Sequence, residues 1–275
     1  MNKIAKAFKA FGLICRHPYL LNHVLDDEQV RKREVLKHYN FPQGLPVVDL
    51  ADLFPGFHQV VDPYAYLSGA TMPTDIALLK SLAQKIGARS YFEIGTWRGE
   101  SVANVAAVVP ECVTLNLSRE EIIGLTGSTA YADLHGLFSR DLPNVRQIYG
   151  NSMQFDFSPY AGKFDLVFID GDHHYEAVRN DSAAVMPLLR DEHAVIVWHD
   201  YGYDPETVRW SVFQGILDGL PGECHRRLVH VAHTMCAVLL PDDIFKTLKT
   251  KPLGDFERPN HYFEVTLDAR EMERK

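Results

Sequence analysis

The sequence predicts an α/β fold with a doubly wound, mostly parallel sheet, and three observations support this prediction. From residue 73 onward, short apolar runs alternate with segments in which apolar residues recur at helical spacing. Two of the runs, 164–169 and 194–198, are apolar almost throughout, which is typical of strands that are buried on both faces. The last two runs follow one another with no helix between them. Strands separated by helices pair in parallel, whereas directly connected strands form an antiparallel hairpin.

Seven strands and several helices follow from this pattern. The segment after Thr74 and Asp75, two residues that can cap a helix, has helical spacing up to Gly87. A later helix is expected to open at Asp204 and Pro205. The last two strands form a hairpin at the edge of a Rossmann-like sheet. The expected strands are 90–94, 112–117, 145–149, 164–169, 194–198, 228–233 and 236–240, and the other expected helices are 101–109, 174–189 and 205–220.

The chain divides into a central domain over residues 73–250 and two extensions. The N-terminal extension, 1–72, begins with helical spacing of apolar residues with lysines between them, and it continues as an irregular segment with several Pro and Gly. A basic amphipathic helix of this kind can lie on a membrane surface. We favour the alternative that it packs on its own domain or on a partner subunit. The C-terminal extension, 251–275, is polar.

The composition limits the classes of protein to which the chain can belong. Its 275 residues are 46% hydrophobic and 23% charged, as in an ordinary globular protein, and the net charge of −8 disfavours a nucleic-acid partner. The longest apolar runs are too short to span a bilayer, and the N-terminus lacks the pattern of a secretory signal. The four cysteines are widely spaced, which is typical of reduced thiols. We expect a cytoplasmic protein that acts on a small molecule and has no nucleic-acid partner. Membrane contact is disfavoured, with the N-terminal amphipathic helix as its only candidate, and the sequence allows a homo-oligomer.

The first strand of the central domain ends in a loop with two glycines. Gly95 allows a sharp turn, and Gly99 allows a ligand to approach the start of the next helix closely. The bulky Trp97 and Arg98 between them are poorly suited to a pyrophosphate, which needs bare backbone. Glu93 supplies a negative charge at the strand end. The loop therefore suits a ligand that has a cationic group and no phosphate.

Acids and histidines follow the two most apolar strands. Asp170 comes directly after the run 164–169, and His199 and Asp200 come directly after the run 194–198. Neighbouring strands lie roughly 4.8 Å apart, so these side chains are expected to meet at the ligand edge of the sheet, with Asp172 close by. Two carboxylates so close repel one another unless a cation or a shared proton lies between them. The sequence therefore predicts a cation-binding or proton-sharing site.

These motifs resemble those of a known enzyme family. The pattern ExGxxxG, formed by Glu93, Gly95 and Gly99, resembles motif I of the class I S-adenosylmethionine (SAM)-dependent methyltransferases. The segments 170–176 and 199–201 are similar to the DGxHxYE and HDY signatures of a methyltransferase family that is related to the macrocin and cephamycin-type O-methyltransferases. The resemblance covers about residues 73–240 and implies that 73–250 is a SAM-dependent methyltransferase domain.

The resemblance implies a set of cofactor-binding residues at the ends of the first strands. Asn116 stands where the family usually has an acid for the ribose hydroxyls, and an amide binds hydroxyls less strongly than a carboxylate does. The implied SAM-binding residues are Glu93, Gly95, Thr96, Trp97, Gly99, Ser101, Asn116, Leu117, Ser118, Asn151, Ser152 and Asp170.

The resemblance also implies a divalent metal. In related O-methyltransferases, acids at these positions hold a magnesium ion that binds the hydroxyls of the substrate. Carried over to this chain, the metal ligands are Asp170, His199 and Asp200. The relatives often have an acid at the position of His199, and a set of two Asp and one His is compatible with Mn²⁺, Fe²⁺ or Zn²⁺ as well as Mg²⁺.

A general base is expected on the loop after the fourth strand. A hydroxyl is a poor nucleophile toward a methyl carbon, and removal of its proton assists the reaction. Asp172, His173 and His174 are the candidates. Asp172 has an alternative role as the N-cap of the helix that follows, because a Glu stands four residues later at the start of an apolar-periodic segment.

The predicted function is transfer of the SAM methyl group to an oxygen of a small or medium-sized hydroxylated acceptor, such as a sugar or a polyketide. Two alternatives remain open from the sequence. A metal-dependent phosphoesterase or other hydrolase also uses Asp and His clusters, and a SAM-binding protein without catalysis would retain these residues for structural reasons. The segments expected to select the acceptor, 41–72 and 124–142, contain no recognisable motif.

Overall fold

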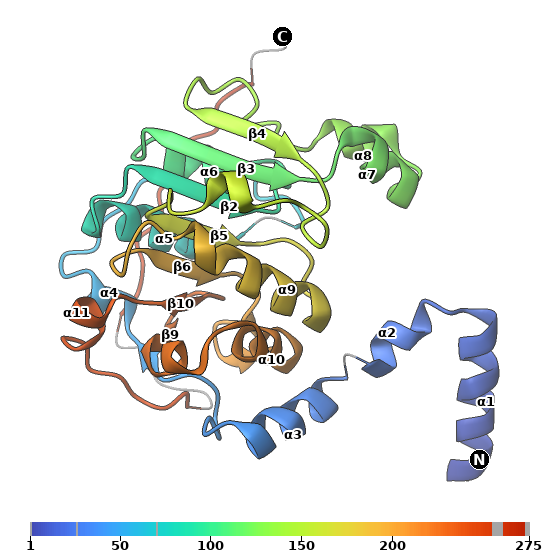
Figure 1. The fold of residues 1–275 in the computed structure, drawn as a ribbon. Helices are drawn as coiled ribbons and strands as arrows, with labels where there is room; N and C mark the ends of the chain where they lie inside the picture. The colour runs from blue at the N-terminus through green and yellow to red at the C-terminus, as the bar shows by residue number, and fades with distance from the viewer. Residues whose placement is uncertain (1, 26, 70, 255–260, 273–275) are drawn as a thin grey trace.

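The computed structural model describes residues 2–25, 27–69, 71–254 and 261–272, and at its centre is one mixed sheet of eight strands (Figure 1). Across the sheet the strands lie in the order β1-β9-β10-β6-β5-β2-β3-β4. The chain runs outward from β2 to β4 and then returns to β5 on the other side of β2. This reversal is the point at which open parallel sheets bind ligands. The strands are β1 (Val47–Val48), β2 (Ser90–Ile94), β3 (Glu111–Asn116), β4 (Val145–Tyr149), β5 (Leu166–Ile169), β6 (Val195–Trp198), β9 (Leu228–Val231) and β10 (Ala237–Leu239), and a separate hairpin consists of β7 (Gly202–Asp204) and β8 (Thr207–Val208).

The pairing of the strands confirms the predicted fold class. The strands β2 to β6 form the parallel part of the sheet, in which β2 pairs with both β3 and β5. The strand β10 runs antiparallel to both β6 and β9, so that β9 and β10 form the expected hairpin. The main sheet contains one strand beyond the predicted seven, because β1 pairs in parallel with β9 outside the hairpin. A run of two apolar residues is too short for the sequence pattern to identify as a strand.

Helices cover both faces of the sheet. Because side chains alternate along a strand, Phe92 and Ile94 of β2 point to one face and are buried in a core with α9 and α10. Tyr91 points to the other face and is buried in a second core with α4, α5 and α6. These two cores make the fold doubly wound. The helices around the sheet are α4 (Leu50–Leu53), α5 (Pro73–Lys85), α6 (Glu100–Ala106), α7 (Arg119–Thr126), α8 (Thr129–Asp133), α9 (Tyr175–Val185), α10 (Trp210–Gly219) and α11 (Asp242–Phe245).

The start of α10 differs from the prediction. A helix does not open at Asp204 and Pro205, because these residues lie in the hairpin of β7 and β8. The Asp204 carboxylate accepts a hydrogen bond (2.8 Å) from the backbone N–H two residues later and holds the turn of this hairpin. The helix begins at Trp210, whose N–H donates to the carboxylate of Glu28, 182 residues away in the chain. A cap that comes from so far leaves no local signal in the sequence.

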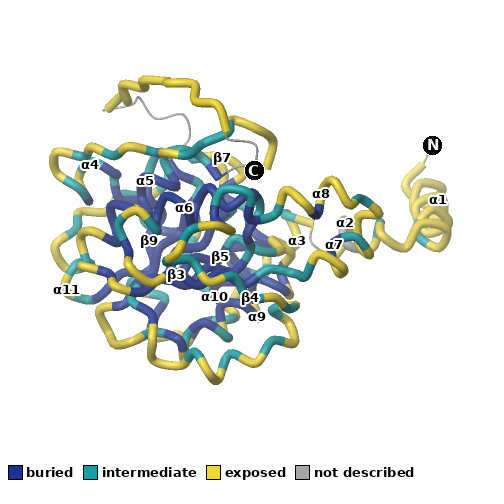
Figure 2. The backbone as a smooth tube through the Cα atoms, turned by 90° about the horizontal axis from the view of Figure 1, so that it is seen from above, coloured by how far each residue is buried: buried dark blue, intermediate teal, exposed yellow. Residues whose placement is uncertain are grey.

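The N-terminal extension is helical, as predicted, with α1 (Lys3–Arg16), α2 (Leu20–Leu25) and α3 (Glu28–His38). The helix α3 packs on the domain through Val35, which is buried in the first core. By contrast, α1 buries none of its residues and projects away from the domain (Figures 1 and 2). The predicted packing on the chain's own domain therefore holds for α3 and is wrong for α1, for which the alternative of packing on a partner subunit stays a prediction. None of the described helices has the length and apolar character required to cross a membrane.

The C-terminal extension is described in part. Residues 261–272 contain neither helix nor strand, and residues 255–260 and 273–275 of the predicted extension lie outside the described residues. The described segment lies against the domain beyond the end of α4, where the ring of Phe263 meets the ring of Phe57 edge to face at 6.1 Å between centroids.

The tight contact of the β2 loop with the β5 loop predicts that Gly95→Ala is destabilising. Gly95 has φ +92°, and a Cβ atom there would lie 2.0 Å from the carbonyl oxygen of Asp170. We expect a loss of roughly 2 kcal/mol or more in the free energy of unfolding. Gly124→Ala is the matched control, because Gly124 lies in α7 with nothing within 4 Å of its added Cβ, and we expect it to stabilise by up to about 1 kcal/mol. Urea unfolding of both variants measures the difference, and equal effects would contradict the proposed backbone contact.

Candidate active site

Three neighbouring strands bring the predicted site residues to one edge of the sheet. The register pairs the last residues of β2, β5 and β6 with one another. Two backbone hydrogen bonds continue the ladder beyond the strands, from Asp170 N–H to the carbonyl of Ile94 (2.8 Å) and from His199 N–H to the carbonyl of Ile169 (3.0 Å). Gly95, Asp170 and His199 therefore lie side by side at the carboxyl ends of the parallel strands, where the topology predicts a ligand.

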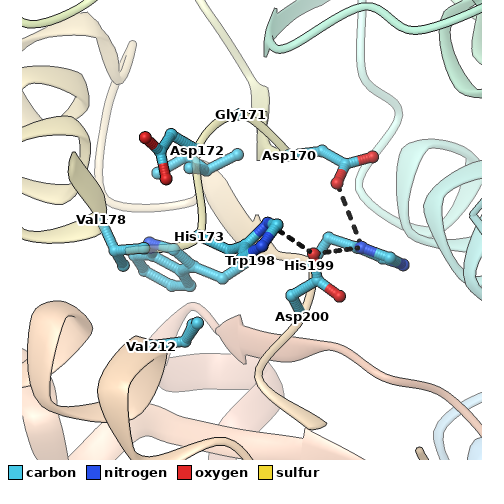
Figure 3. Close-up of a pocket in the computed structure, with 10 residues that line it drawn as sticks. Asp170, Gly171, Asp172, His173, Val178, Trp198, His199, Asp200 and Val212 are labelled. Carbon is cyan, nitrogen blue, oxygen red and sulfur yellow. Dashed lines mark ion pairs between the residues drawn. The ribbon is translucent and has the colours of Figure 1, made fainter. Parts of the chain in front are cut away.

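The three residues predicted as metal ligands form a compact group (Figure 3). Nδ1 of His199 lies 3.1 Å from Oδ1 of Asp170 and 3.5 Å from Oδ2 of Asp200. One ligand atom from each residue lies within 4.8 Å of the other two. Asp200 has φ 56°, a left-handed conformation that residues other than glycine seldom adopt. This conformation follows β6 directly and lets Asp200 share the site with His199, its neighbour in the chain.

Asp75 completes the group, and its role was missed in the sequence. Oδ2 of Asp75 lies 3.1 Å from Nε2 of His199, and the fully buried carboxylate also accepts hydrogen bonds from the backbone N–H groups of Met72 (3.0 Å) and Met235 (2.9 Å). The helix α5 begins at Pro73, so Asp75 lies within its first turn and not at the predicted cap. An acid in a first helical turn is common. Its partner His199 is 124 residues away, so no local pattern identifies the contact.

The hydrogen bond to Asp75 decides which nitrogen of His199 faces the site. With Nε2–H directed at Asp75, Nδ1 faces Asp170 and Asp200, and it is a buried atom without a hydrogen bond of good geometry among the described residues. A carboxylate behind one ring nitrogen, with the other nitrogen directed at further ligands, is the usual arrangement of a metal-binding histidine.

Charges within the group shift the pKa values of its own members. Burial disfavours the charged imidazole, but the charge of Asp170 and the contacts with Asp170, Asp200 and Asp75 outweigh it and hold the pKa of His199 well above its ordinary value. Burial would raise the pKa of Asp200, but His199, His173 and Arg209 lower it. A protonated His199 places a positive charge between the two acids, where the sequence predicts a cation or a shared proton.

A small pocket of about 10 Å³ adjoins this group, with room for about one water molecule or ion. Its walls are the loop after β5, from Asp170 to His173, and the end of β6 (Figure 3). Of the three predicted bases, His173 lies nearest to the group, with Nδ1 3.7 Å from Oδ2 of Asp200. The imidazole of His173 has a pKa below its ordinary value because of burial and of the charge of Arg209.

Asp172 and His174 pair with each other. Oδ1 of Asp172 lies 2.5 Å from Nδ1 of His174 and accepts a hydrogen bond (2.8 Å) from the His174 backbone N–H. Burial would raise the pKa of Asp172, but these bonds and the charges of His174 and His173 lower it. The N-cap position of α9 belongs to His174, so the alternative that Asp172 is the N-cap is wrong, although Asp172 holds the turn before the helix. Figure 3 shows its carboxylate directed away from His199.

Glu93 lies in the core beneath the β2 loop. Its carboxyl group is fully buried and accepts hydrogen bonds from the hydroxyls of Tyr91 (2.5 Å) and Ser101 (3.1 Å). Burial raises its pKa to about 8, and the charge of Asp170 adds to this effect. The structure thus brings Glu93 and Ser101 together and gives Glu93 a proton near neutral pH.

Side chains from α8, from the turns after it and from β3 pack around the β2 loop. The ring of Trp97 contacts the rings of Tyr131 (4.4 Å between centroids) and His135 (4.7 Å). Gly99 has φ +81°, and a Cβ atom there would lie 2.4 Å from Oγ of Ser139. The hydroxyl of Thr96 is hydrogen-bonded in the interior to that of Thr114 of β3. The loop is therefore held from both sides.

The ends of β3 and β4 hold the remaining predicted cofactor residues. The amide of Asn116 donates to the carbonyl of Thr96 (3.1 Å) and lies 2.7 Å from Nδ1 of His135, so Asn116 ties β3 to the β2 loop. Leu117 follows it and is half-buried. Ser118 is the N-cap of α7 and forms a capping box with Glu121. After β4, Asn151 is exposed and accepts a hydrogen bond (3.0 Å) from a backbone N–H two residues later, and Ser152 is half-buried.

A second buried acid was also missed. Asp181 of α9 is 1% exposed, and its Oδ2 has no hydrogen bond among the described residues. Burial raises the pKa of Asp181 to about 6, although hydrogen bonds from Ser152 and Asn180 act to lower it. A single acid on a predicted helix is usually exposed, so the sequence gives no signal of this environment.

A protein-family model described as a methyltransferase domain matches residues 92–201. No curated protein matches the chain. Among solved structures, the chain is similar to an O-methyltransferase from Bacillus cereus in complex with S-adenosylhomocysteine (SAH), with 20% identity, a TM-score of 0.43 and coverage of 82% of this chain and 97% of that chain. It is also similar to an SAH-bound methyltransferase from Podospora anserina, with 18% identity, a TM-score of 0.44 and coverage of 63% and 80%.

The family match spans the part of the chain that carries the site. It begins in β2 and ends one residue after Asp200, so it contains the β2 loop and the group of Asp170, His199 and Asp200. Residues 92–201 match a methyltransferase domain, and the resemblance in the motifs of the sequence is confirmed for this part of the chain.

The burial of Glu93 predicts a dependence of stability on pH. Because its pKa is raised from 4.5 to about 8 in the folded chain, its contribution to stability is fully present below about pH 4.5 and is lost as the pH rises to about 8. Glu93→Gln removes this contribution. We therefore expect the stability of the variant, relative to the wild type, to increase between about pH 5 and 8 in urea unfolding. The exposed Glu176→Gln is the control, and a constant difference between Glu93→Gln and the wild type would contradict the assigned pKa.

Proposed function

We propose that the chain transfers the methyl group of SAM to a hydroxyl oxygen of a small or medium-sized acceptor, such as a sugar or a polyketide. The observation that carries this proposal is the convergence of Asp170, His199 and Asp200 beside the β2 loop, at the switch point of a methyltransferase fold. The β2 loop is suited to a nucleoside without phosphates, and the acids lie where an acceptor hydroxyl would meet its methyl group.

SAM would lie along the carboxyl ends of β2, β3 and β4. The buried carboxyl of Glu93 and the hydroxyl of Ser101 lie beneath the β2 loop, and a cationic ammonium near them would favour the ionised form of Glu93. Asp170 adds a negative charge on the neighbouring strand end, which would favour a cationic cofactor. The residues that we propose to bind SAM are Glu93, Gly95, Thr96, Trp97, Gly99, Ser101, Asn116, Leu117, Ser118, Asn151, Ser152 and Asp170.

A divalent metal would be held by Asp170, His199 and Asp200. The fit rests on the buried Nδ1 atom of His199, which lacks a hydrogen bond and lies between the two carboxylates, with Asp75 fixing the opposite nitrogen. When bound, such an ion would orient the acceptor hydroxyl and lower its pKa. The imidazole ligand favours Mn²⁺, Fe²⁺ or Zn²⁺ over Mg²⁺.

The protein residues align the reactants and accept a proton. The acceptor oxygen attacks the methyl carbon as the bond from that carbon to sulfur breaks, and neutral SAH leaves. We propose His173 as the base that receives the hydroxyl proton, because it lines the pocket 3.7 Å from Asp200. Asp172 and His174, which bind each other, hold the loop that carries His173. Alignment of the two reactants supplies much of the acceleration.

Two measurements on the wild type and on Asp170→Asn test the proposal. We expect the wild type to bind SAH in calorimetry and to convert SAM to SAH with a hydroxylated acceptor from a panel of sugars and phenols. Asp170→Asn removes one acid from the site, so we expect a loss of ~100-fold or more in the rate of methyl transfer. Glu176→Gln is the matched control, because Glu176 is exposed in the adjacent helix and pairs with Arg179.

Three outcomes would count against this function. A wild-type protein without affinity for SAH contradicts the assignment of the β2 loop. An unchanged rate in Asp170→Asn contradicts the role of the acidic group. Phosphatase activity in the absence of SAM would instead support the hydrolase alternative.

A further inference from the structure

A second group of potential metal ligands lies at the same edge of the sheet, beyond the active site. Asp49 follows β1, and His233 lies just after β9, which pairs in parallel with β1. His261 reaches them from the C-terminal segment. Oδ2 of Asp49 lies 3.4 Å from Nδ1 of His261 and 3.8 Å from Nε2 of His233, and one ligand atom of each residue lies within 4.8 Å of the others.

The surroundings fix the directions of these three side chains. Oδ1 of Asp49 accepts a hydrogen bond (2.9 Å) from the backbone N–H of Ala51 at the start of α4, which leaves Oδ2 for the imidazoles. His233 has φ 67°, a left-handed conformation that is costly for a residue other than glycine. The ring of Phe263 packs edge to face on that of His233, with centroids 5.3 Å apart, and so holds the C-terminal segment over the group.

The spacing suits an ion better than direct hydrogen bonds. In the described structure neither imidazole is joined to Asp49 by a hydrogen bond. Zn²⁺ binds nitrogen and carboxylate oxygen at about 2.0–2.2 Å, so that tetrahedral ligands lie roughly 3.3 Å from one another. The distance from Asp49 to His261 (3.4 Å) is already close to this value, and the distance from Asp49 to His233 (3.8 Å) is longer.

A large cavity adjoins the group. It has a volume of about 490 Å³, and Asp49, His233 and Phe263 form part of its wall. Asp204 and Glu206 of the β7–β8 hairpin also line it, against one cation, Lys251. The acids of the wall outnumber its cations, which favours a bound cation.

We propose that Asp49, His233 and His261 bind a divalent transition metal of the Zn²⁺ type, separate from the active-site group. Three protein ligands leave one coordination position free, and in metal sites of this kind that position takes water or a small anionic or polar ligand. Asp49 and His233 line the cavity, so such a ligand would reach the metal from there. The metal links the C-terminal segment to the ends of β1 and β9, and this inference does not depend on the proposed methyl transfer.

Titration of the full chain with Co²⁺, a spectroscopic substitute for Zn²⁺, tests the second site. The Asp170→Asn variant serves as the parent protein, because metal binding at the active-site group is weakened in it. Any metal already bound is first removed with a chelator. We expect one tightly bound Co²⁺ with the intense absorption of four-coordinate cobalt, displaced by one equivalent of Zn²⁺. Adding His233→Ala or His261→Ala should weaken binding by ~100-fold or more, whereas His38→Ala, an exposed histidine in α3, should not.

Absence of stoichiometric Co²⁺ binding in Asp170→Asn would overturn the proposal. Equal binding by the His261→Ala and His38→Ala variants would overturn it as well. Misfolding would not explain a loss of Co²⁺ binding in His261→Ala, because His261 lies outside the described helices and strands and its side chain is 44% exposed. Circular dichroism of each variant checks the fold.

A different observation concerns α1, which has one apolar and one basic face. Ile4, Phe8 and Phe11 recur at helical spacing and are 68–75% exposed. Residues 1–25 contain four Lys or Arg and no Asp or Glu, whereas the remaining 250 residues contain 24 (28 − 4) Lys or Arg and 36 Asp or Glu. Residues 1–25 therefore have a net charge of +4, whereas residues 26–275 have a net charge of −12.

We infer that α1 binds the surface of an anionic lipid bilayer. A helix with aromatic and aliphatic side chains on one face and lysines on the other lies in the plane of the headgroups, with its apolar face inserted. The lysines complement anionic lipids, whereas the acidic domain is repelled by them. The projection of α1 from the domain leaves its apolar face free to insert (Figure 2).

Sedimentation with vesicles tests this inference. The full chain should bind vesicles of equal phosphatidylglycerol and phosphatidylcholine, bind pure phosphatidylcholine weakly, and dissociate at high salt. Phe8→Asp with Phe11→Asp should reduce binding by ~10-fold or more. Leu125→Asp is the matched control, because Leu125 is 75% exposed in α7. Absence of binding to the anionic vesicles would overturn the inference, and a dimer that dissociates only in the Phe8 and Phe11 variant would assign α1 to a second copy of the chain.

Discussion

The contact between Asp75 and His199 joins three parts of the fold at the active site. Asp75 belongs to α5, and His199 follows β6. The same carboxylate accepts a hydrogen bond from the backbone N–H of Met235, which precedes β10. Because the carboxylate is fully buried, loss of any of these bonds would leave an unsatisfied acid in the interior. The contact therefore keeps Nδ1 of the imidazole directed at Asp170 and Asp200, and the chemistry that we propose depends on that direction.

The parallel sheet explains why so many polar groups gather at one edge. The strands β2, β5, β6, β9 and β1 all end there, because β10 alone of the central strands runs the other way. At two of these ends a residue in the left-handed conformation follows the strand, Asp200 after β6 and His233 after β9. After β6 this conformation lets the neighbours His199 and Asp200 contribute to one group of ligands. The two groups are thus products of the same topology, and each is completed by a distant segment, α5 in one case and the C-terminal segment in the other.

Much of the fold and part of the site could be predicted from the sequence, because both depend on local patterns. The strands β2 and β4 have the predicted bounds, and the group of Asp170, His199 and Asp200 follows from acids placed directly after buried strands. What could not be predicted depends on contacts between distant residues. Glu28 caps α10 across 182 residues, Asp75 meets His199 across 124, and the short β1 exists only through its pairing with β9. The environment of Glu93 was also hidden, since its burial with Tyr91 and Ser101 is a property of packing and not of the motif.

Pulsed electron paramagnetic resonance of Mn²⁺ bound to the His233→Ala variant, which lacks the proposed second site, would show whether His199 ligates the metal at the active site. We expect coupling of the metal to one imidazole nitrogen, lost when His199→Gln is added and weakened when Asp75→Asn is added, because the imidazole then loses its charged partner. Coupling to no nitrogen, or coupling that persists unchanged in His199→Gln, would contradict the assignment of His199 Nδ1 as a metal ligand at the active site.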